Sequence, residues 1–361
     1  HTRLQGDWSS DVCSSDLRFM EARRKWRAMT APLTGATDNS IFFNWQNNGD
    51  ESLANAGAIM WSTSGTGEGG NGLYNSSAIT NSTNSVLRYN SGWVALNNTK
   101  TSLLFDGSTN YPYLLYYTGP YNEVGDYIQR GTAASTLSAK GTLRQGNITF
   151  PGLANGWHMI GNPYASKARL NGGTNLNAGG YVWDPNMTGT GGFRAVTLST
   201  TTVESGQAFF VYAETGGGSM SFAETSKVAG SSRSNFRMDD RSEGDITIEL
   251  NKNVSGATEL ADLAIVNYRS RSENGLPKLD QIHENLAIYQ DAKNYGISTR
   301  TFNNGEDVIQ LRLWQMKAES YQLKIDLRGM NLPMGSVAVL QDAFLNKEIP
   351  LSISAANQVD F

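Results

Sequence analysis

Histidine and cysteine are scarce in this sequence. Its 361 residues include one cysteine, Cys13, and three histidines, His1, His158 and His283. A single cysteine cannot build an internal disulfide framework. The chain also has too few imidazoles and thiols to supply the ligands of a zinc site or the base of a histidine-dependent nucleophilic triad. The lysine-bearing P-loop, the G-x-S-x-G elbow and the H-E-x-x-H helix are also missing from the sequence. We therefore expect that the chain is not an enzyme and holds no cofactor.

Charged residues and long apolar runs are sparse as well. Charged residues make up 17% of the chain and its net charge is −4, which favours neither nucleic acid nor an anionic membrane surface as a partner. The sequence contains no run of about 18 apolar residues, the length that a transmembrane helix needs. We expect neither nucleic-acid binding nor membrane insertion.

Turn-forming residues and short alternating apolar runs are abundant instead. Glycine accounts for 38 residues, which is above its usual share of about 7%. In residues 308–314 (VIQLRLW), apolar Ile309, Leu311 and Leu313 alternate with polar residues, which is the period of a strand with one buried face. Many such runs between Gly- and Asn-rich turns predict an all-β protein of antiparallel sandwiches, of the jelly-roll or immunoglobulin-like kind.

A change in composition divides the chain into two expected domains. Residues 230–244 are rich in small and charged side chains and are typical of a linker. They separate a first sandwich at residues 18–229 from a second sandwich at residues 245–361. The sequence therefore predicts two sandwiches in tandem.

Three local features carry more detailed expectations. Thr136–Thr142 and Asn147–Phe150 are two short apolar runs around a turn, and we expect them to pair with each other. Pro277–Asn285 is the best candidate for a helical turn. Phe209 and Phe210 are neighbours in a predicted strand, so their rings should lie on opposite faces of the sheet.

The first 17 residues differ in origin from the rest. Residues 7–17 read DWSSDVCSSDL, which resembles the translation of a common short-read sequencing adapter. We therefore treat residues 1–17 as an artefact that contributes nothing to the core. Cys13 and His1 are then not native, and the natural N-terminus, with any signal peptide, is expected to lie outside the sequence.

Several motifs in a fixed order resemble a known group of proteins. The motifs are TLSAKGTLRQGNITF at 136–150, GWHMIGNPY at 156–164, YVWDP at 181–185, SGQAFFV at 205–211 and FAETSKV at 222–228. Together they resemble a module of large exported proteins of the phylum Bacteroidota that use the type IX secretion system. The resemblance implies an extracellular or outer-surface location. It also implies a sorting domain beyond residue 361, so the second sandwich is expected to be incomplete at its C-terminus.

A few side chains are candidates for ligand binding. Asp184 and Asn186 carry the oxygen atoms that Ca²⁺ prefers, although an Asx turn explains Asp184 equally well. Trp183, Tyr181 and Trp93 could serve as sugar-stacking platforms if their rings are exposed, and are ordinary core if they are buried.

Carboxylates are the remaining candidates for hydrolysis, because glycoside hydrolases need only two of them several ångströms apart. Glu204, Glu214 and Glu224 lie near the end of the first sandwich. Gly65–Gly70 matches G-x-G-x-x-G, but no helical pattern follows it, so a phosphate cradle is not expected.

These observations favour a non-catalytic structural or adhesive module of a secreted or cell-surface protein. Its partner would be an extracellular polysaccharide or the surface of a host or neighbouring cell. The alternative is a carbohydrate-binding or polysaccharide-degrading surface protein, and the exposure of the three aromatic rings distinguishes the two hypotheses.

Overall fold

The computed structural model confirms the all-β sandwich fold. It describes residues 15–361 except 22–24, 36–37, 51–56, 76–83, 108, 118, 120–133, 188, 190, 230–244, 255, 269–274, 282, 302–304, 329, 331, 333–334 and 344. Strand accounts for 55% of it and helix for 4%. Among the described residues, the helical segments are a π-helical turn at Phe42–Gln46 and 3-10 turns at Leu198–Thr200 and Glu224–Ser226.

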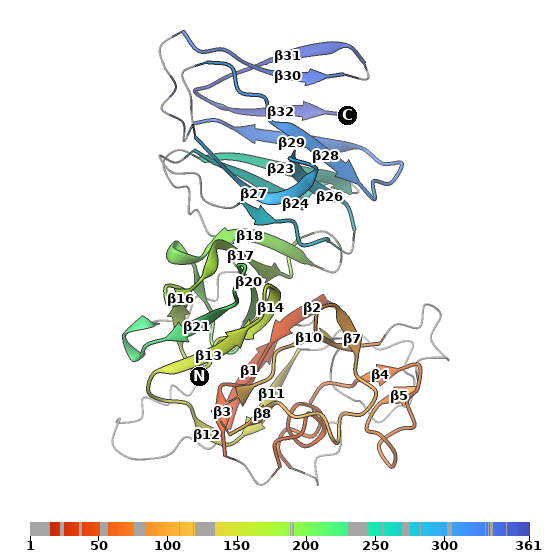
Figure 1. The fold of residues 1–361 in the computed structure, drawn as a ribbon. Coiled ribbons are helices and arrows are strands. Elements are labelled where there is room, and N and C mark those ends of the chain that lie inside the picture. The colour runs from red at the N-terminus through yellow and green to blue at the C-terminus, as the bar shows by residue number, and fades with distance from the viewer. Residues whose placement is uncertain are drawn as a thin grey trace.

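Figure 1 shows three stacked units, which we call the N-terminal unit (residues 15–145), the middle unit (146–229) and the C-terminal unit (245–361). The residues expected as one first sandwich therefore comprise two sheet assemblies. The described part of the segment Pro277–Asn285 contains no helical turn, so that prediction is wrong. The chain there runs from a short strand through an irregular segment into the next strand.

The N-terminal unit contains a four-stranded sheet with the order β2-β10-β6-β7 and several two-stranded pairs. Its apolar residues enclose a core around Trp45, Phe105 and Tyr117, each at most 1% exposed. Its strands are β1 (Ser15–Met20), β2 (Lys25–Met29), β3 (Leu33–Thr34), β4 (Trp61–Ser62), β5 (Tyr74–Asn75), β6 (Val86–Tyr89), β7 (Trp93–Ala95), β8 (Phe105–Asp106), β9 (Thr109–Asn110), β10 (Tyr113–Tyr117), β11 (Ser135–Lys140) and β12 (Thr142–Leu143).

Strand β1 begins at Ser15 and pairs with β11, so Ser15, Asp16 and Leu17 belong to a sheet. Asp16 and Leu17 are not members of the buried apolar clusters, and residues 1–14 lie outside the described residues, so it stays a prediction that residues 1–17 contribute nothing to the core. A strand pairs through backbone N–H and C=O groups, which every residue except proline supplies, so this pairing needs no selected side chains. The expected pairing of β11 with the strand that begins near Asn147 is wrong, because β11 forms a two-stranded sheet with β1, whereas β13 (Ile148–Leu153) pairs with β21 (Gly218–Phe222).

The middle unit is a sandwich around strand β20. Its sheets have the orders β14-β20-β17-β18, β13-β21-β16 and β19-β15-β22. Phe210 faces one buried cluster and Phe209 faces another, which confirms the predicted alternation. The strands are β13 (Ile148–Leu153), β14 (Gly156–Gly161), β15 (Lys167–Arg169), β16 (Gly173–Thr174), β17 (Leu176–Asp184), β18 (Gly192–Thr197), β19 (Thr202–Val203), β20 (Ala208–Ala213), β21 (Gly218–Phe222) and β22 (Lys227–Val228).

The C-terminal unit is one large curved sheet with the order β28-β26-β27-β24-β23-β29-β32, and β25 pairs with β27. Apolar residues of the β30-β31 hairpin pack against the core of this unit. Strands β24 and β27 are parallel, as are β4 and β5, so the sheets are not purely antiparallel. The strands are β23 (Asp245–Val254), β24 (Ala257–Tyr268), β25 (Leu276–Pro277), β26 (Asn285–Gln290), β27 (Lys293–Arg300), β28 (Gln310–Trp314), β29 (Tyr321–Asp326), β30 (Ala338–Asp342), β31 (Lys347–Leu351) and β32 (Ala356–Asp360).

One buried cluster joins the three units, and we call it the shared core. Residues 230–244 thus separate two groups of strands without separating their cores. The members of the shared core are Ala28 and Leu114 of the N-terminal unit, Met159, Tyr181, Trp183, Phe193, Ala195, Ala208 and Phe210 of the middle unit, and Leu276, Leu279 and Ile297 of the C-terminal unit.

A buried polar network reinforces the junction between the middle and C-terminal units. The Lys278 ammonium lies 2.6 Å from Asp262, and the two side chains are 1% and 0% exposed. Asp262 also accepts hydrogen bonds from the backbone N–H of Leu286 and the side chain of Gln281. Gln281 in turn accepts a hydrogen bond from the backbone N–H of Phe193 at 2.7 Å. Each buried charge is therefore paired, and the network reaches across the junction.

Candidate binding cleft

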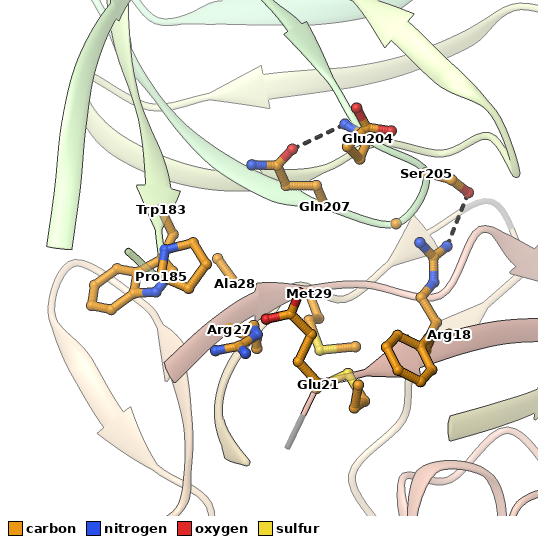
Figure 2. Close-up of a pocket in the computed structure, with 13 residues that line it drawn as sticks. Arg18, Glu21, Arg27, Ala28, Met29, Trp183, Pro185, Glu204, Ser205 and Gln207 are labelled. Carbon is orange, nitrogen blue, oxygen red and sulfur yellow. Dashed lines mark hydrogen bonds between the residues drawn. The ribbon is translucent and has the colours of Figure 1, made fainter. Parts of the chain in front are cut away.

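A cleft of about 660 Å³ lies where the N-terminal unit meets the middle unit (Figure 2). Its volume falls within the range of about 300–1,000 Å³ that is usual for small-ligand pockets, which often form between domains. Strands β1 and β2 supply one wall. The C-terminal end of β17 with the residue that follows it, and the turn between β19 and β20, supply the other wall.

The turn between β19 and β20 is shaped by Gly206. This residue has a φ of +57°, and a β-carbon there would lie 2.2 Å from the guanidinium of Arg18. The backbone N–H of Thr30 donates to the Gly206 carbonyl at 2.8 Å, and Arg18 donates to the Ser205 hydroxyl at 3.0 Å. Only glycine fits at this close approach. These contacts join the two walls at one end of the cleft.

Trp183 joins the walls at the other end. Its indole N–H donates to the backbone carbonyl of Trp26 at 2.9 Å. The ring packs edge-on against Phe193 with 4.7 Å between ring centroids, and the residue is only 2% exposed. Bonds at both ends hold the two walls in a defined arrangement.

Gln207 carries an unsatisfied hydrogen-bond donor at the cleft wall. Its side-chain oxygen accepts the backbone N–H of Glu204 at 2.9 Å, which fixes the orientation of the amide. Its side-chain nitrogen is buried and has no hydrogen-bond partner among the described residues. Figure 2 shows this nitrogen turned away from Glu204, toward the side of Ala28 and Trp183. Leaving such a buried donor unpaired costs about 1–3 kcal/mol.

The charges that line the cleft balance. Arg18 and Arg27 contribute two positive charges, and Glu21 and Glu204 contribute two negative charges. Glu204 also lies 3.5 Å from the ammonium of Lys167. The formal charge of the lining is therefore zero. Its polar side chains are two guanidinium groups, two carboxylates, the Gln207 amide and the Ser205 hydroxyl, and the Arg18 guanidinium is already paired with the Asp16 carboxylate at 2.8 Å.

An exposed aromatic ring stands at the cleft. Phe19 belongs to the lining and is 71% exposed, whereas Met20 and Met29 provide buried apolar surface beside it. Phe19 is not among the ring platforms predicted from the sequence. The alternation of Arg18, Phe19 and Met20 next to the presumed artefact was the available signal, because it is typical of an edge strand with one exposed face.

Of the three rings proposed as sugar platforms, Trp183 lies at one end of the cleft, whereas Tyr181 and Trp93 are not part of its lining. Tyr181 and Trp183 are 0% and 2% exposed, and both belong to the shared core. Trp93 is half-buried and stacks on Phe193, with 6.0 Å between centroids and 14° between the ring planes. The prediction is wrong for Tyr181 and Trp183, because their rings are interior. Trp93 packs against the same core.

Asp184 and Asn186, the calcium candidates, form an Asx turn. The Asp184 carboxylate accepts the backbone N–H of Asn186 at 2.8 Å. Burial raises the pKa of Asp184, and the Asn186 N–H together with the charges of Arg194 and Lys25 offsets only part of this rise. Within the described ranges of the chain, no three Asp, Glu, His or Cys side chains gather as a metal site. The turn accounts for Asp184 without a cation, and calcium binding stays a prediction.

The three candidate carboxylates have separate partners. Glu204 borders the cleft, whereas Glu214 accepts a hydrogen bond from the Asn177 amide at 2.9 Å. Glu224 forms an ion pair with Lys227 and accepts the backbone N–H of Gly146. Burial alone would raise the pKa of Glu224, but these two bonds outweigh it and lower the pKa below its ordinary value. The structure does not bring the three together as a catalytic pair.

The two remaining histidines, His158 and His283, are not part of the cleft lining. A ring nitrogen of His158 lies 2.7 Å from the backbone carbonyl of Ala154. His283 belongs to the C-terminal unit, where burial lowers its pKa. The segment Gly65–Gly70 is a loop that leads into the short strand β5 rather than into a helix, so it lacks the helix N-terminus that a phosphate cradle uses.

No protein-family model, curated protein or solved structure matches the chain. Among the residues that the structure describes, no helix has the length and hydropathy needed to cross a membrane. A proposal for the function of this chain therefore rests on its own residues and their geometry.

Proposed function

We propose that this chain is a non-catalytic structural and adhesive module of a secreted or cell-surface protein. The observation that supports this most is the shared core. Domains that are connected only by flexible linkers move relative to one another, whereas a large apolar interface holds them in a fixed orientation. The three units pack through one apolar cluster, which suits a spacer that holds a binding surface away from a cell.

The buried polar network supports the same proposal. Lys278 and Asp262 are both removed from solvent, and breaking such a pair leaves an uncompensated buried charge. Gln281 adds hydrogen bonds to Phe193 across the junction. Apolar packing and directional polar bonds thus act together against relative motion of the middle and C-terminal units.

The location is proposed from the sequence motifs. GWHMIGNPY at 156–164 and SGQAFFV at 205–211 form strands β14 and β20, which pair with each other in the middle unit. The resemblance of these motifs to Bacteroidota proteins of the type IX secretion pathway favours export to the outer surface. The same resemblance suggests that further domains accompany this chain.

Surface display tests the proposal. The chain would be produced in a Bacteroidota host between a signal peptide and a type IX sorting domain, and the control would carry both signals without residues 15–361. We expect protease to remove the chain from intact cells, and we expect these cells to adhere more strongly than the control to polysaccharide-coated surfaces, without release of sugars. Failure to reach the surface, or sugar release that Glu204→Gln abolishes, would contradict the proposal.

A further inference from the structure

We infer that the cleft between the N-terminal and middle units binds a neutral carbohydrate, with Phe19 as the ring platform and the Gln207 amide as a hydrogen-bond donor. This inference deepens the proposed adhesive function and rests on it, because it names the class of ligand that the module would hold. Three independent features of the cleft lead to it.

The first feature is the balance of charge. Arg18, Arg27, Glu21 and Glu204 sum to zero within one lining. An acidic ligand would meet the two glutamates, and a basic ligand would meet the two arginines. A hydroxyl group carries no charge and can both donate and accept hydrogen bonds, so it can lie beside carboxylate, guanidinium and amide groups without charge repulsion. The lining therefore favours a neutral ligand with many hydroxyls over a charged one.

The second feature is the exposed ring. Phe19 is 71% exposed, although large aromatic side chains are usually well covered. The C–H face of a sugar ring is apolar, and stacking it on an aromatic face removes both surfaces from water. Met29 also lines the cleft but is buried, so Phe19 is the ring that offers apolar surface to a ligand.

The third feature is the unsatisfied amide. The Gln207 nitrogen has no partner among the described residues, the side chain is only 7% exposed, and its oxygen is already bonded to Glu204. A hydroxyl in the cleft would supply the acceptor that this nitrogen lacks. Because neighbouring atoms cover the nitrogen, we expect a lining side chain to shift when the ligand binds.

The inference is tested by calorimetric titration of the purified chain with named probes. The neutral probes are cellohexaose, xylohexaose and mannohexaose, and the competitors are hexagalacturonate and a tetra-alanine peptide. We expect at least one neutral hexasaccharide to bind. We expect Phe19→Ala to weaken that binding about 10-fold or more, which corresponds to about 1.4 kcal/mol. Gln207→Leu should weaken it about 5-fold, the effect of one hydrogen bond.

Phe361→Ala is the matched control, because Phe361 is also an exposed phenylalanine, at 53%, and it lies at the far end of the molecule in the C-terminal unit (Figure 1). It should bind as the unmodified chain does. Thermal unfolding of each variant checks its folding, and Phe19→Ala tests the inference even if Gln207→Leu is unstable. The inference is overturned if no neutral probe binds, if Phe19→Ala binds normally, or if the acidic saccharide or the peptide binds more tightly.

The two proposals fail in different ways. Binding by purified protein does not depend on export, so it is measured whether or not the chain reaches a cell surface. Displayed cells that adhere while the purified chain binds no neutral saccharide would leave the adhesive function intact and remove the cleft as its site. If the purified chain binds a neutral saccharide but the displayed chain does not reach the cell surface, the cleft remains a binding site and the proposed function at the cell surface is contradicted.

Discussion

The hydroxyl of Tyr181 in the middle unit lies against the backbone of Gly296 in the C-terminal unit, so close that a β-carbon at position 296 would be 1.7 Å from it. Such a contact is far below any real carbon–oxygen separation between non-bonded atoms. The Tyr181 ring is fully buried and cannot move aside cheaply. Burial also raises the pKa of this phenol well above its ordinary value. The two units can approach this closely only because position 296 has no side chain.

Gly296→Ala should therefore destabilise the protein. Overpacking a filled core costs about 1–3 kcal/mol, and we expect a loss of that size in the free energy of unfolding measured with guanidinium chloride. Gly69→Ala is the control, because a β-carbon there meets no atom within 4 Å. Equal stability of the two variants would mean that the units do not pack as described.

The buried ion pair at the same junction should be far more sensitive than an exposed one. Lys278→Met removes the partner of Asp262 and leaves a buried carboxylate without its counter-charge, which costs about 3–5 kcal/mol. Lys324 and Glu249 are 2.9 Å apart but 30% and 27% exposed, so Lys324→Met should cost at most about 1 kcal/mol. Unfolding experiments on both variants measure this difference, and similar losses would contradict it.

Much of the local strand structure follows from the sequence alone. Strand β28 (Gln310–Trp314) forms within residues 308–314, where the alternating apolar run predicts a strand. Phe209 and Phe210 face different clusters, because consecutive side chains of a strand point to opposite faces. Periodicity of this kind depends only on neighbouring residues, which the sequence displays directly.

The partners of those strands do not follow from the sequence. Alternation shows that one face of a strand is apolar but not which sheet covers it, so the role of Tyr181 as core between two units was not predictable. The segment Pro277–Asn285 looked helical in composition. In the structure its side chains make contacts with residues distant in the sequence. Lys278 forms an ion pair with Asp262, and Gln281 accepts a hydrogen bond from the backbone N–H of Phe193. The cleft likewise depends on residues such as Phe19 and Gln207 that are nearly 190 positions apart.

Asp184→Asn should raise stability at neutral pH and leave it unchanged at low pH. The folded-state pKa of Asp184 lies above its ordinary value of 3.8, mainly because of burial. The folded protein thus holds this proton to a higher pH than the unfolded chain, so stability falls as the pH rises from about 3.8 through the folded-state pKa. Asparagine keeps the oxygen that accepts the Asn186 N–H and carries no charge.

Thermal unfolding at pH 3 and pH 7 measures the effect of this substitution, with and without Ca²⁺. We expect a higher melting temperature for Asp184→Asn at pH 7 only. A lower melting temperature at pH 7 would contradict the prediction. A loss of stability that occurs only with Ca²⁺ would instead support a calcium site at Asp184 and Asn186.

The C-terminal unit should associate when it is produced alone as residues 245–361. Leu276, Leu279 and Ile297 are 1%, 7% and 3% exposed in the whole chain, where they belong to the shared core with residues of the middle unit. Removing residues 1–244 uncovers them, and each buried aliphatic side chain of this kind contributes about 1.5–3 kcal/mol of apolar burial. Strand β32 also ends the row of strands in the large sheet, and an open sheet edge favours pairing between molecules.

Light scattering after size-exclusion chromatography measures this association, with the full chain as the control. We expect oligomers or aggregates from residues 245–361 at micromolar concentration and a smaller population of them from the full chain. Leu279→Gln with Ile297→Thr should reduce association of the fragment, because the two changes make the uncovered patch more polar. A fragment that stays monomeric and unfolds cooperatively would show that the C-terminal unit does not need the shared core.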